Sequence, residues 1–227
     1  MILRGTTEQM VAKGTELLYQ ACKHFIRKKD RVVLAVPGGR SVVEIFNRLG
    51  LLDLEWPKVH IFLLDERLVP DSHHESNYRL VMESFGESVP GGVVHPFRYE
   101  VERAGESVTA YGNALDRCGG CFDIVLASSG EDGHIGSLFP GHPSVKAKSN
   151  RFILVHDSPK PPSGRMSASV GLLRRSDTGI LLFFGGGKHN ALQNFCNSDQ
   201  THIQCPAKII AAMPTYYVLT DLEVDQP

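Results

Sequence analysis

His134 lies at the end of a glycine-rich segment, Ser128-Ser-Gly-Glu-Asp-Gly-His134, that directly follows an apolar run. A histidine side chain takes up and releases a proton near neutral pH, which suits it to act as a general base. Asp132, two residues earlier, can orient the imidazole ring and stabilise its protonated form. A lone histidine is usually structural or exposed, but a position just after a buried strand favours chemistry. We therefore predict that His134 is a base assisted by Asp132.

Two further glycine-rich segments, Pro37-Gly-Gly-Arg-Ser41 and Gly185-Gly-Gly-Lys188, each stand between an apolar run and a helical pattern. Glycine lets the backbone approach an anion, and the N–H groups and dipole at the start of a helix favour phosphate. Neither segment is a Walker loop or a G-x-G-x-x-G fingerprint, so nucleotide binding is not indicated. Each segment taken alone is also compatible with an ordinary strand-to-helix turn. Together they predict an anion site built from Gly38, Gly39, Arg40, Ser41 and Lys188.

Two charged segments add guanidinium groups to this set. Asp65-Glu-Arg67 comes directly after an apolar run, where a solvated face is a poor explanation. The Arg67 guanidinium can form a fork to a phosphate or a carbonyl, held by either acidic neighbour. The alternative is a structural ion pair. Ser158-Pro-Lys-Pro-Pro-Ser-Gly-Arg165 brings a second guanidinium to a proline-shaped loop, where a solvated surface cation is the competing interpretation.

The cysteines and histidines form no recognisable metal motif. Cys118-Gly-Gly-Cys121 has the C-x-x-C form, which can mark a redox pair or half of a zinc site. No second C-x-x-C follows, and both cysteines adjoin an apolar run, where cysteine serves as a small hydrophobe. The histidines form no H-E-x-x-H set. We therefore predict neither a metal nor a cofactor.

The elements that must position these residues alternate between apolar runs and helical patterns. We expect strands over 31–36, 59–64, 122–127, 152–155, 179–184 and 216–219, and helices over 7–27, 41–49, 77–85, 105–117 and from 188. This alternation predicts an α/β fold over 1–227: one doubly wound, mainly parallel sheet with helices on both faces. In such sheets ligands bind beyond the carboxyl ends of the strands. The polar motifs follow Val36, Leu64, Ala127 and Phe184, so we expect them to meet there.

Composition excludes several classes of partner. The 227 residues include 24 basic and 25 acidic side chains, so the net charge is −1. This balance indicates neither nucleic acid nor a membrane as a partner. The chain shows no signal-peptide core and no apolar run near 18 residues. We expect a cytoplasmic protein, a monomer or weak homo-oligomer, whose partner is a small molecule.

Taken together, these motifs resemble the 6-phosphogluconolactonase family, within the larger group that includes glucosamine-6-phosphate deaminases. The resemblance runs from about Val32 to about Leu192 and rests on several motifs in the same order. They are Gly38-Gly-Arg-Ser41, Asp65-Glu-Arg67 with Val69-Pro70, Ser76-Asn77, Gly130-Glu-Asp-Gly-His134 with Ser137-Leu-Phe-Pro140, Lys160-Pro-Pro162 with Arg165, and Gly187-Lys188.

Two positions separate the lactonases from the deaminases. The deaminases resemble Asp-Glu-Tyr where this chain has Arg67, and they continue after Asp-Gly-His with a segment ending in Asn-Glu-Pro. Their glutamate takes part in ring opening, whereas Ser137-Leu-Phe-Pro140 holds no acid. One departure from the lactonases is Ser128, which stands where the family usually has glycine.

The resemblance implies metal-independent hydrolysis of 6-phospho-D-glucono-1,5-lactone to 6-phospho-D-gluconate in the oxidative pentose phosphate pathway. His134 would deprotonate the attacking water, and donors must face the developing negative charge. Backbone N–H groups around Gly130 or the Arg67 guanidinium can serve, and the sequence leaves both open. Three residues, Ser41, Arg165 and Lys188, would bind the 6-phosphate, with Gly38 and Gly39 giving backbone access. The set expected to hold the substrate also includes Arg40, Asp65 and Gly130.

Other functions remain as alternatives. The chain can be an enzyme of the glucosamine-6-phosphate deaminase/isomerase type, or a non-catalytic sugar-phosphate-binding protein. A serine hydrolase would need a G-x-S-x-G elbow, which is absent from the sequence. His134 beside Asp132 favours an enzyme over a sensor.

Overall fold

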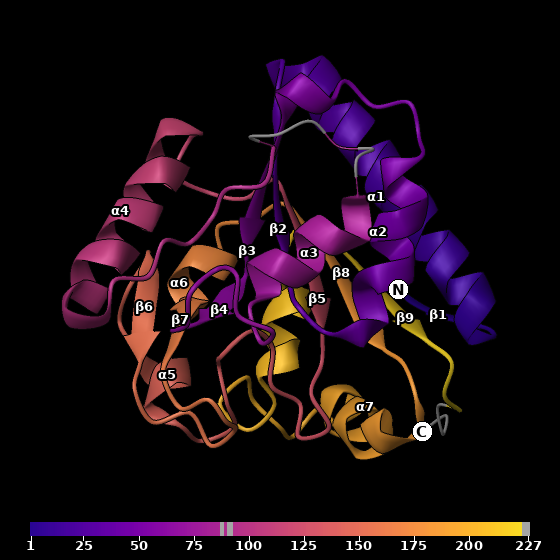
Figure 1. The fold of residues 1–227 in the computed structure, drawn as a ribbon. Coiled ribbons are helices and arrows are strands. Elements are labelled where there is room, and N and C mark those ends of the chain that lie inside the picture. The colour runs from indigo at the N-terminus through magenta and orange to yellow at the C-terminus, as the bar shows by residue number, and fades with distance from the viewer. Residues whose placement is uncertain (87–88, 90–92, 224–227) are drawn as a thin grey trace.

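A computed structural model describes residues 1–86, 89 and 93–223. Its centre is a six-stranded sheet of order β1-β9-β8-β5-β2-β3, in which every neighbouring pair is parallel (Figure 1). Its strands are β1 (Ile2–Arg4), β2 (Val32–Val36), β3 (Val59–Leu63), β5 (Ile124–Ser128), β8 (Thr178–Phe183) and β9 (Thr215–Thr220). The predicted α/β class, with a mainly parallel central sheet and helices, is confirmed.

A second, antiparallel sheet corrects the prediction of a single sheet. Its strands, in the order β4-β7-β6, are β4 (Asp65–Arg67), β7 (Arg165–Ala168) and β6 (Phe152–Val155). Leu64 joins the two sheets, because its N–H donates to the carbonyl of Val36 at 2.7 Å and its carbonyl accepts from the N–H of Ala168 at 2.8 Å. The segment expected to be a loop after the second strand is therefore a strand that pairs about a hundred residues away.

Five helices begin and end close to the predicted bounds: α1 (Thr7–Lys29), α2 (Val43–Gly50), α3 (Asn77–Phe85), α4 (Ala104–Arg117) and α7 (His189–Cys196). Two short helices, α5 (Pro143–Lys146) and α6 (Val170–Leu173), were not predicted. Helices α1, α2 and α3 pack beside one another, while α4 packs against β6 (Figure 1). In the described part of the chain, no helix has the length and apolar character needed to cross a membrane.

The strand order changes direction between β2 and β5. From β2 the chain moves outward to β3, and from β5 it moves the opposite way to β8 and β9. The loops that leave β2 and β5 therefore diverge and leave a crevice at the carboxyl edge of the sheet. The strands below it are buried along their length, with Leu34, Ala35 and Leu126 fully enclosed, so this edge is rigidly supported.

The amino edge is held by Asp123, a buried carboxylate just before β5. Its Oδ2 accepts from the N–H of Val33 at 3.0 Å, and its other carboxylate oxygen pairs with Lys29 of α1. Because the side chain is only 4% exposed, its removal leaves the Val33 N–H buried without an acceptor.

We predict that Asp123→Ala lowers the free energy of unfolding by about 1–3 kcal/mol, the cost of an unsatisfied buried donor. Urea unfolding of both proteins measures this difference. The exposed carboxylate Glu102 supplies the control, since Glu102→Ala should change the same quantity by no more than about 0.5 kcal/mol. Equal effects of the two substitutions would contradict this role of Asp123.

Candidate active site

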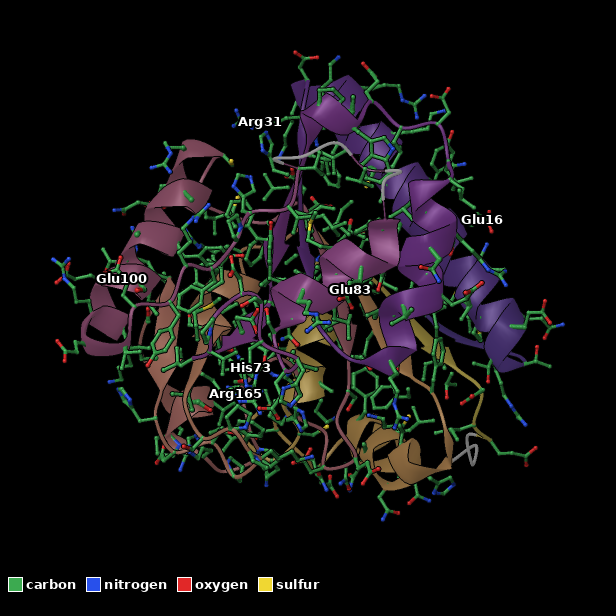
Figure 2. The ribbon with its side chains drawn as sticks, viewed as in Figure 1. Glu16, Arg31, His73, Glu83, Glu100 and Arg165 are labelled. Atoms are coloured by element: carbon green, nitrogen blue, oxygen red, sulfur yellow. The ribbon has the colours of Figure 1, made fainter. Side chains whose placement is uncertain are left out.

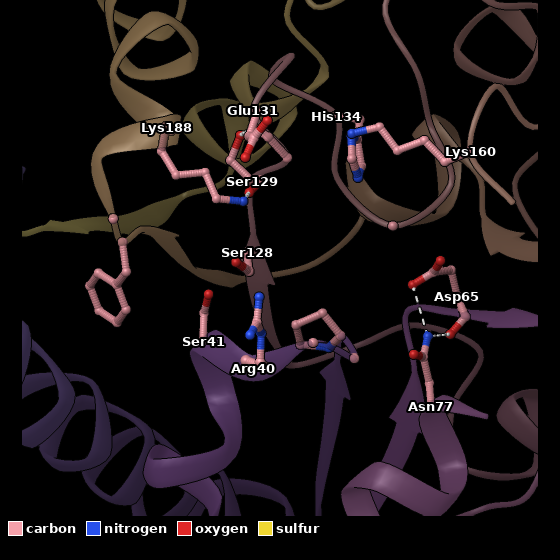
Figure 3. Close-up of a pocket in the computed structure, with 18 of the residues that line it drawn as sticks. Arg40, Ser41, Asp65, Asn77, Ser128, Ser129, Glu131, His134, Lys160 and Lys188 are labelled. Carbon is pink, nitrogen blue, oxygen red and sulfur yellow. Dashed lines mark hydrogen bonds between the residues drawn. The ribbon is translucent and has the colours of Figure 1, made fainter. Parts of the chain in front are cut away.

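A cavity of about 870 Å³ opens at the carboxyl edge, where the loops after β2, β5 and β8 meet (Figure 3). Of the residues predicted from the sequence, all but Asp132 line it. They are Gly38, Gly39, Arg40, Ser41, Asp65, Arg67, Gly130, His134, Arg165 and Lys188. The expectation that these separate motifs meet at one edge of the sheet matches this arrangement. Ser128 also lines the cavity, between the first and last of the glycine loops.

His134 and Asp132 are in direct contact. Nδ1 of His134 lies 2.5 Å from Oδ1 of Asp132, which also accepts from the His134 N–H at 3.2 Å. The His134 ring packs 4.9 Å from the ring of Phe139, between centroids. It also lies over Gly130, where an added Cβ would come within 2.0 Å of the imidazole. A glycine is therefore required beneath the ring.

Asp132 is held in its ionised form. Its partial burial on its own raises the pKa, but the hydrogen bond and charge of His134, together with Lys160, outweigh burial and hold the pKa of Asp132 well below its usual range. An ionised carboxylate accepts from Nδ1–H, so the lone pair of the ring falls on Nε2. The geometry suits proton abstraction by Nε2.

The loop backbone is already hydrogen-bonded. The N–H of Ser129 donates to Leu182 at 3.0 Å, that of Gly130 donates to the carbonyl of His134 at 2.8 Å, and that of Gly133 donates to Gly130 at 3.1 Å. The sequence left two kinds of oxyanion donor open, the backbone N–H groups around Gly130 and the Arg67 guanidinium. Because these N–H groups already have acceptors, the structure disfavours the backbone around Gly130 as the donor. Gly130 contributes space for the ring rather than a free donor.

Two glycine loops of matching shape border the cavity. Gly39 has φ 96° before the short turn η1 (Arg40–Val42), and Gly185 has φ 89° before η5 (Gly186–Lys188). Positive φ values of this size favour glycine over residues with a side chain. Figure 3 shows Arg40 and Ser41 on one side and Lys188 on the other, with Ser128 and Ser129 between them.

Lys188 points into this space. Its Nζ donates to the carbonyl of Ser129. Burial lowers the pKa of Lys188, and the nearby Lys160 adds to that effect, while the carboxylates of Glu131 and Asp132 oppose it. A half-buried ammonium beside a glycine loop is a suitable partner for a phosphate dianion.

Arg67 is held by a backbone carbonyl rather than by an acidic neighbour, which corrects the prediction. Its Nη1 donates to the carbonyl of Glu75, and its Nε is buried with no partner in the described structure. Glu66 instead accepts from the N–H groups of Asn77 and Tyr78, each at 2.8 Å, at the start of α3. Burial raises the pKa of Glu66 in spite of these bonds. Arg67 also lines the cavity, so its guanidinium is available as a cationic group of the cavity wall.

Asp65 links neighbouring loops. Its Oδ2 accepts from Ser137 Oγ at 2.7 Å, and its carbonyl accepts from Asn77 Nδ2 at 2.8 Å (Figure 3). An added Cβ on Gly38 would lie 1.8 Å from Asn77 Oδ1, so the first glycine loop packs directly on Asn77. Asn77 belongs to the Ser76-Asn77 motif, whose residue types alone indicated no role for it.

Arg165, which was predicted to bind the phosphate, lines the cavity but donates to carbonyls of its own loop. Its Nε donates to the carbonyl of Pro162 at 2.8 Å, and its Nη2 donates to Pro161 at 2.9 Å and Lys160 at 3.3 Å. Its Nη1 lies 3.8 Å from Asp65 Oδ2, and the residue is 5% exposed. Burial lowers the pKa of Arg165, which Asp65 opposes. These contacts fix the loop that carries Lys160, so Arg165 positions this loop.

Three charged residues of the cavity wall had no role assigned from the sequence: Lys160, Glu131 and Asp221. Asp221 Oδ1 accepts from the N–H of Gly185 at 2.9 Å. Lys160 Nζ lies 3.8 Å from Asp132 Oδ2, and its place in Lys160-Pro-Pro162 was the available signal. Glu131 packs against Gly187 beside Lys188, and nothing in its local sequence distinguishes it from an exposed acid.

The chain is similar to known proteins of one family in sequence and in fold. The family described as glucosamine-6-phosphate isomerases/6-phosphogluconolactonase matches residues 5–217. A protein of Borreliella burgdorferi named 6-phosphogluconolactonase is 32% identical over 87% of each chain. A rice protein (Oryza sativa subsp. indica) named probable 6-phosphogluconolactonase 4, chloroplastic, is 32% identical over 73% of this chain, which spans 57% of its length. The crystal structure of a 6-phosphogluconolactonase from Shewanella baltica has a similar fold, with a TM-score of 0.85, 20% identity and 96% of each chain covered.

We predict that Arg165→Gln lowers the free energy of unfolding by about 1.5–3 kcal/mol, because buried charge-assisted hydrogen bonds to the loop carbonyls are lost. Chemical denaturation measures the change. Lys160→Gln, on the same loop but with a side chain 44% exposed, should alter stability by no more than about 0.5 kcal/mol. A variant at Arg165 as stable as the wild type would show that its contacts do not hold the loop.

Proposed function

Because the chain belongs to the family of glucosamine-6-phosphate isomerases and 6-phosphogluconolactonases, we propose that it hydrolyses 6-phospho-D-glucono-1,5-lactone to 6-phospho-D-gluconate, as in the oxidative pentose phosphate pathway. The observation that carries this proposal is the His134–Asp132 pair, placed in a cavity between two glycine loops with cationic side chains. The pair supplies a base for water, and the loops supply a site for phosphate.

In the proposed reaction Nε2 of His134 takes a proton from water as its oxygen attacks the lactone carbonyl. Asp132 keeps the proton on Nδ1 and stabilises the imidazolium that forms. The carbonyl oxygen becomes negative, and the guanidinium of Arg67, which lines the cavity, is the donor that we assign to it. As the intermediate collapses, the bond from the carbonyl carbon to the ring oxygen breaks. The imidazolium returns its proton to that oxygen, which becomes a hydroxyl.

The phosphate is assigned to Ser41, Arg40 and Lys188, with Gly38 and Gly39 giving backbone access. These groups lie on opposite sides of one cavity, so a single anion can bridge them. Arg165 supports the site through the Lys160 loop.

The lactonase activity is favoured over deamination by the residues themselves. Arg67 stands where the deaminases resemble a tyrosine. Phe139 stands immediately before Pro140, in the place of the ring-opening glutamate, and its ring packs on His134. A purely binding protein would have no need for an oriented base, so His134 beside Asp132 favours catalysis.

We also propose where the protein acts, in which assembly it acts and which partner it binds. We place the activity in the cytoplasm, in a monomer or weak homo-oligomer whose 227 residues act as one α/β domain. The substrate is a small phosphorylated lactone, and neither nucleic acid nor a membrane is a partner. The proposed catalytic steps use only side chains of this chain and require no metal or cofactor.

We predict that His134→Ala lowers kcat by roughly 10²–10⁴-fold, the usual worth of a general base, with a much smaller change in substrate binding. The measurement is hydrolysis of freshly generated 6-phosphogluconolactone, corrected for its spontaneous opening. His156→Ala, at an exposed histidine, is the matched control and should keep wild-type turnover. Near-normal turnover in the His134 variant would remove this residue from the mechanism. Wild-type activity on glucosamine 6-phosphate but not on the lactone would overturn the function.

We also predict that Lys188→Gln lowers kcat/KM for the phosphorylated lactone by about ten- to a hundredfold, because a charge-assisted hydrogen bond of about 1.5–3 kcal/mol is lost. Unphosphorylated gluconolactone should be affected far less. Arg165→Gln should lower kcat/KM for both substrates alike, as expected of a residue that positions a loop. If Lys188→Gln also reduced both equally, Lys188 would not be reading the phosphate.

A further inference from the structure

We propose that His60, His95 and Cys118 form a binding site for a divalent transition-metal ion of the zinc type. One ligand atom from each residue lies within 4.8 Å of the other two. His60 belongs to the first half of β3, whereas the cavity lies beyond the carboxyl ends of the strands. Figure 2 shows Arg31, next to this cluster, far from Arg165 of the active site, so the two sites occupy opposite edges of the sheet.

The distances suit a tetrahedral ion. Nδ1 of His60 lies 3.2 Å from Nε2 of His95. Two nitrogens bound at 2.0–2.1 Å to a tetrahedral zinc ion lie about 3.3–3.4 Å apart, so these nitrogens are already spaced as ligands. A thiolate at about 2.3 Å from the ion would lie about 3.6 Å from each nitrogen, within the spread of the cluster. Imidazole nitrogen and cysteine sulfur are donors that zinc prefers, and water can complete the set.

The ligands come from three segments that are separately held. The N–H of His95 donates to the carbonyl of Ile61 at 2.8 Å, which fixes its segment beside β3. Its ring stacks on Phe62 with centroids 4.2 Å apart and planes within 9°. Cys118 caps the end of α4 and is buried. Ordering these groups costs little on binding, because the fold has already placed them.

The charge state of the cluster is compatible with binding. Burial lowers the pKa of His95 to about 4, and burial with Arg31 lowers that of His60, so both rings are neutral at pH 7. Burial raises the pKa of the Cys118 thiol, although Arg31 and Arg117 favour its thiolate. Because the pKa of Cys118 is raised overall, its sulfur carries a proton when no ion is bound. An ion that binds to the sulfur displaces this proton, so one proton is released for each ion bound.

The expected role is structural. An ion here ties β3, the segment around His95 and the end of α4 together, and it binds the folded chain in preference to the unfolded one. Such an ion stabilises the protein by mass action, and a concentration one hundred times Kd should raise Tm by about 5–10 °C. It touches no residue of the cavity wall, so lactone hydrolysis should not depend on it.

A second group of potential ligands, His73, His74 and Glu75, serves as an internal contrast. These residues are consecutive, and Nδ1 of His73 already accepts from the N–H of Glu75 at 3.2 Å. We assign no ion to this group. His74, an exposed histidine of this group, serves as the control residue in the binding test.

The test is binding of Zn²⁺ to the full chain by equilibrium dialysis, with Co²⁺ as a spectroscopic probe. We expect one tight equivalent, a thiolate-to-cobalt charge-transfer band and the rise in Tm. Cys118→Ser should abolish the band, and both Cys118→Ser and His60→Gln should weaken zinc binding at least about tenfold. Cys121→Ser, from the same C-x-x-C motif, and His74→Ala should change neither measurement.

Three results would overturn the proposal: a charge-transfer band that persists in Cys118→Ser, equal zinc affinity of wild type and His60→Gln, or no tight equivalent in the wild type. Melting of each variant without metal identifies any that fails to fold, and the remaining ligand variant then decides. Lactone hydrolysis measured after chelation separates this site from the proposed activity. Unchanged hydrolysis supports a structural ion, and loss that zinc restores contradicts that role.

Discussion

All six strands of the central sheet run in the same direction, so every strand of this sheet ends at the same edge. This constraint gathers residues that are far apart in the chain. The loop after β2 brings Arg40 and Ser41, the loop after β5 brings His134, and the loop after β8 brings Lys188. Because β5 lies between β2 and β8, the loop that carries His134, the proposed base, leaves the sheet between the two glycine loops. The order of strands thus sets where His134 lies relative to Arg40, Ser41 and Lys188.

Close packing at two glycines makes this geometry specific. The His134 ring occupies the space above Gly130, and the Asn77 amide occupies the space above Gly38. In each contact the polar side chain fills the space that a Cβ on the glycine would occupy. This contact is one of packing and not a hydrogen bond. The Asp132 carboxylate then fixes the ring direction, and Asp65 fixes the amide. The His134 ring and the Asn77 amide are therefore each held by close packing on a glycine and by a hydrogen bond to a carboxylate.

The sequence was sufficient for features that depend on local pattern. Apolar runs located β2, β3, β5, β8 and β9 but not the short β1, and the helix over 77–85 has the predicted bounds. The pairing of Asp65–Arg67 with Arg165–Ala168 was not predicted, since no local signal records a partner a hundred residues away. The same limit applies to Arg165, whose charge suggested phosphate but whose donors contact the carbonyls of its own loop. His60, His95 and Cys118 follow no regular spacing, so only the fold brings them together.

The distribution of charge explains how a nearly neutral protein can hold a phosphorylated substrate. The net charge is −1, so the protein has no large field to attract a polyanion. At the cavity, Lys160 Nζ lies 3.8 Å from Asp132 Oδ2, and the carboxylates of Glu131 and Asp132 act on the ammonium group of Lys188. These carboxylates offset part of the positive charge of the cavity wall. Under the proposed function, affinity for the phosphate then depends on contacts inside the cavity and not on the overall charge.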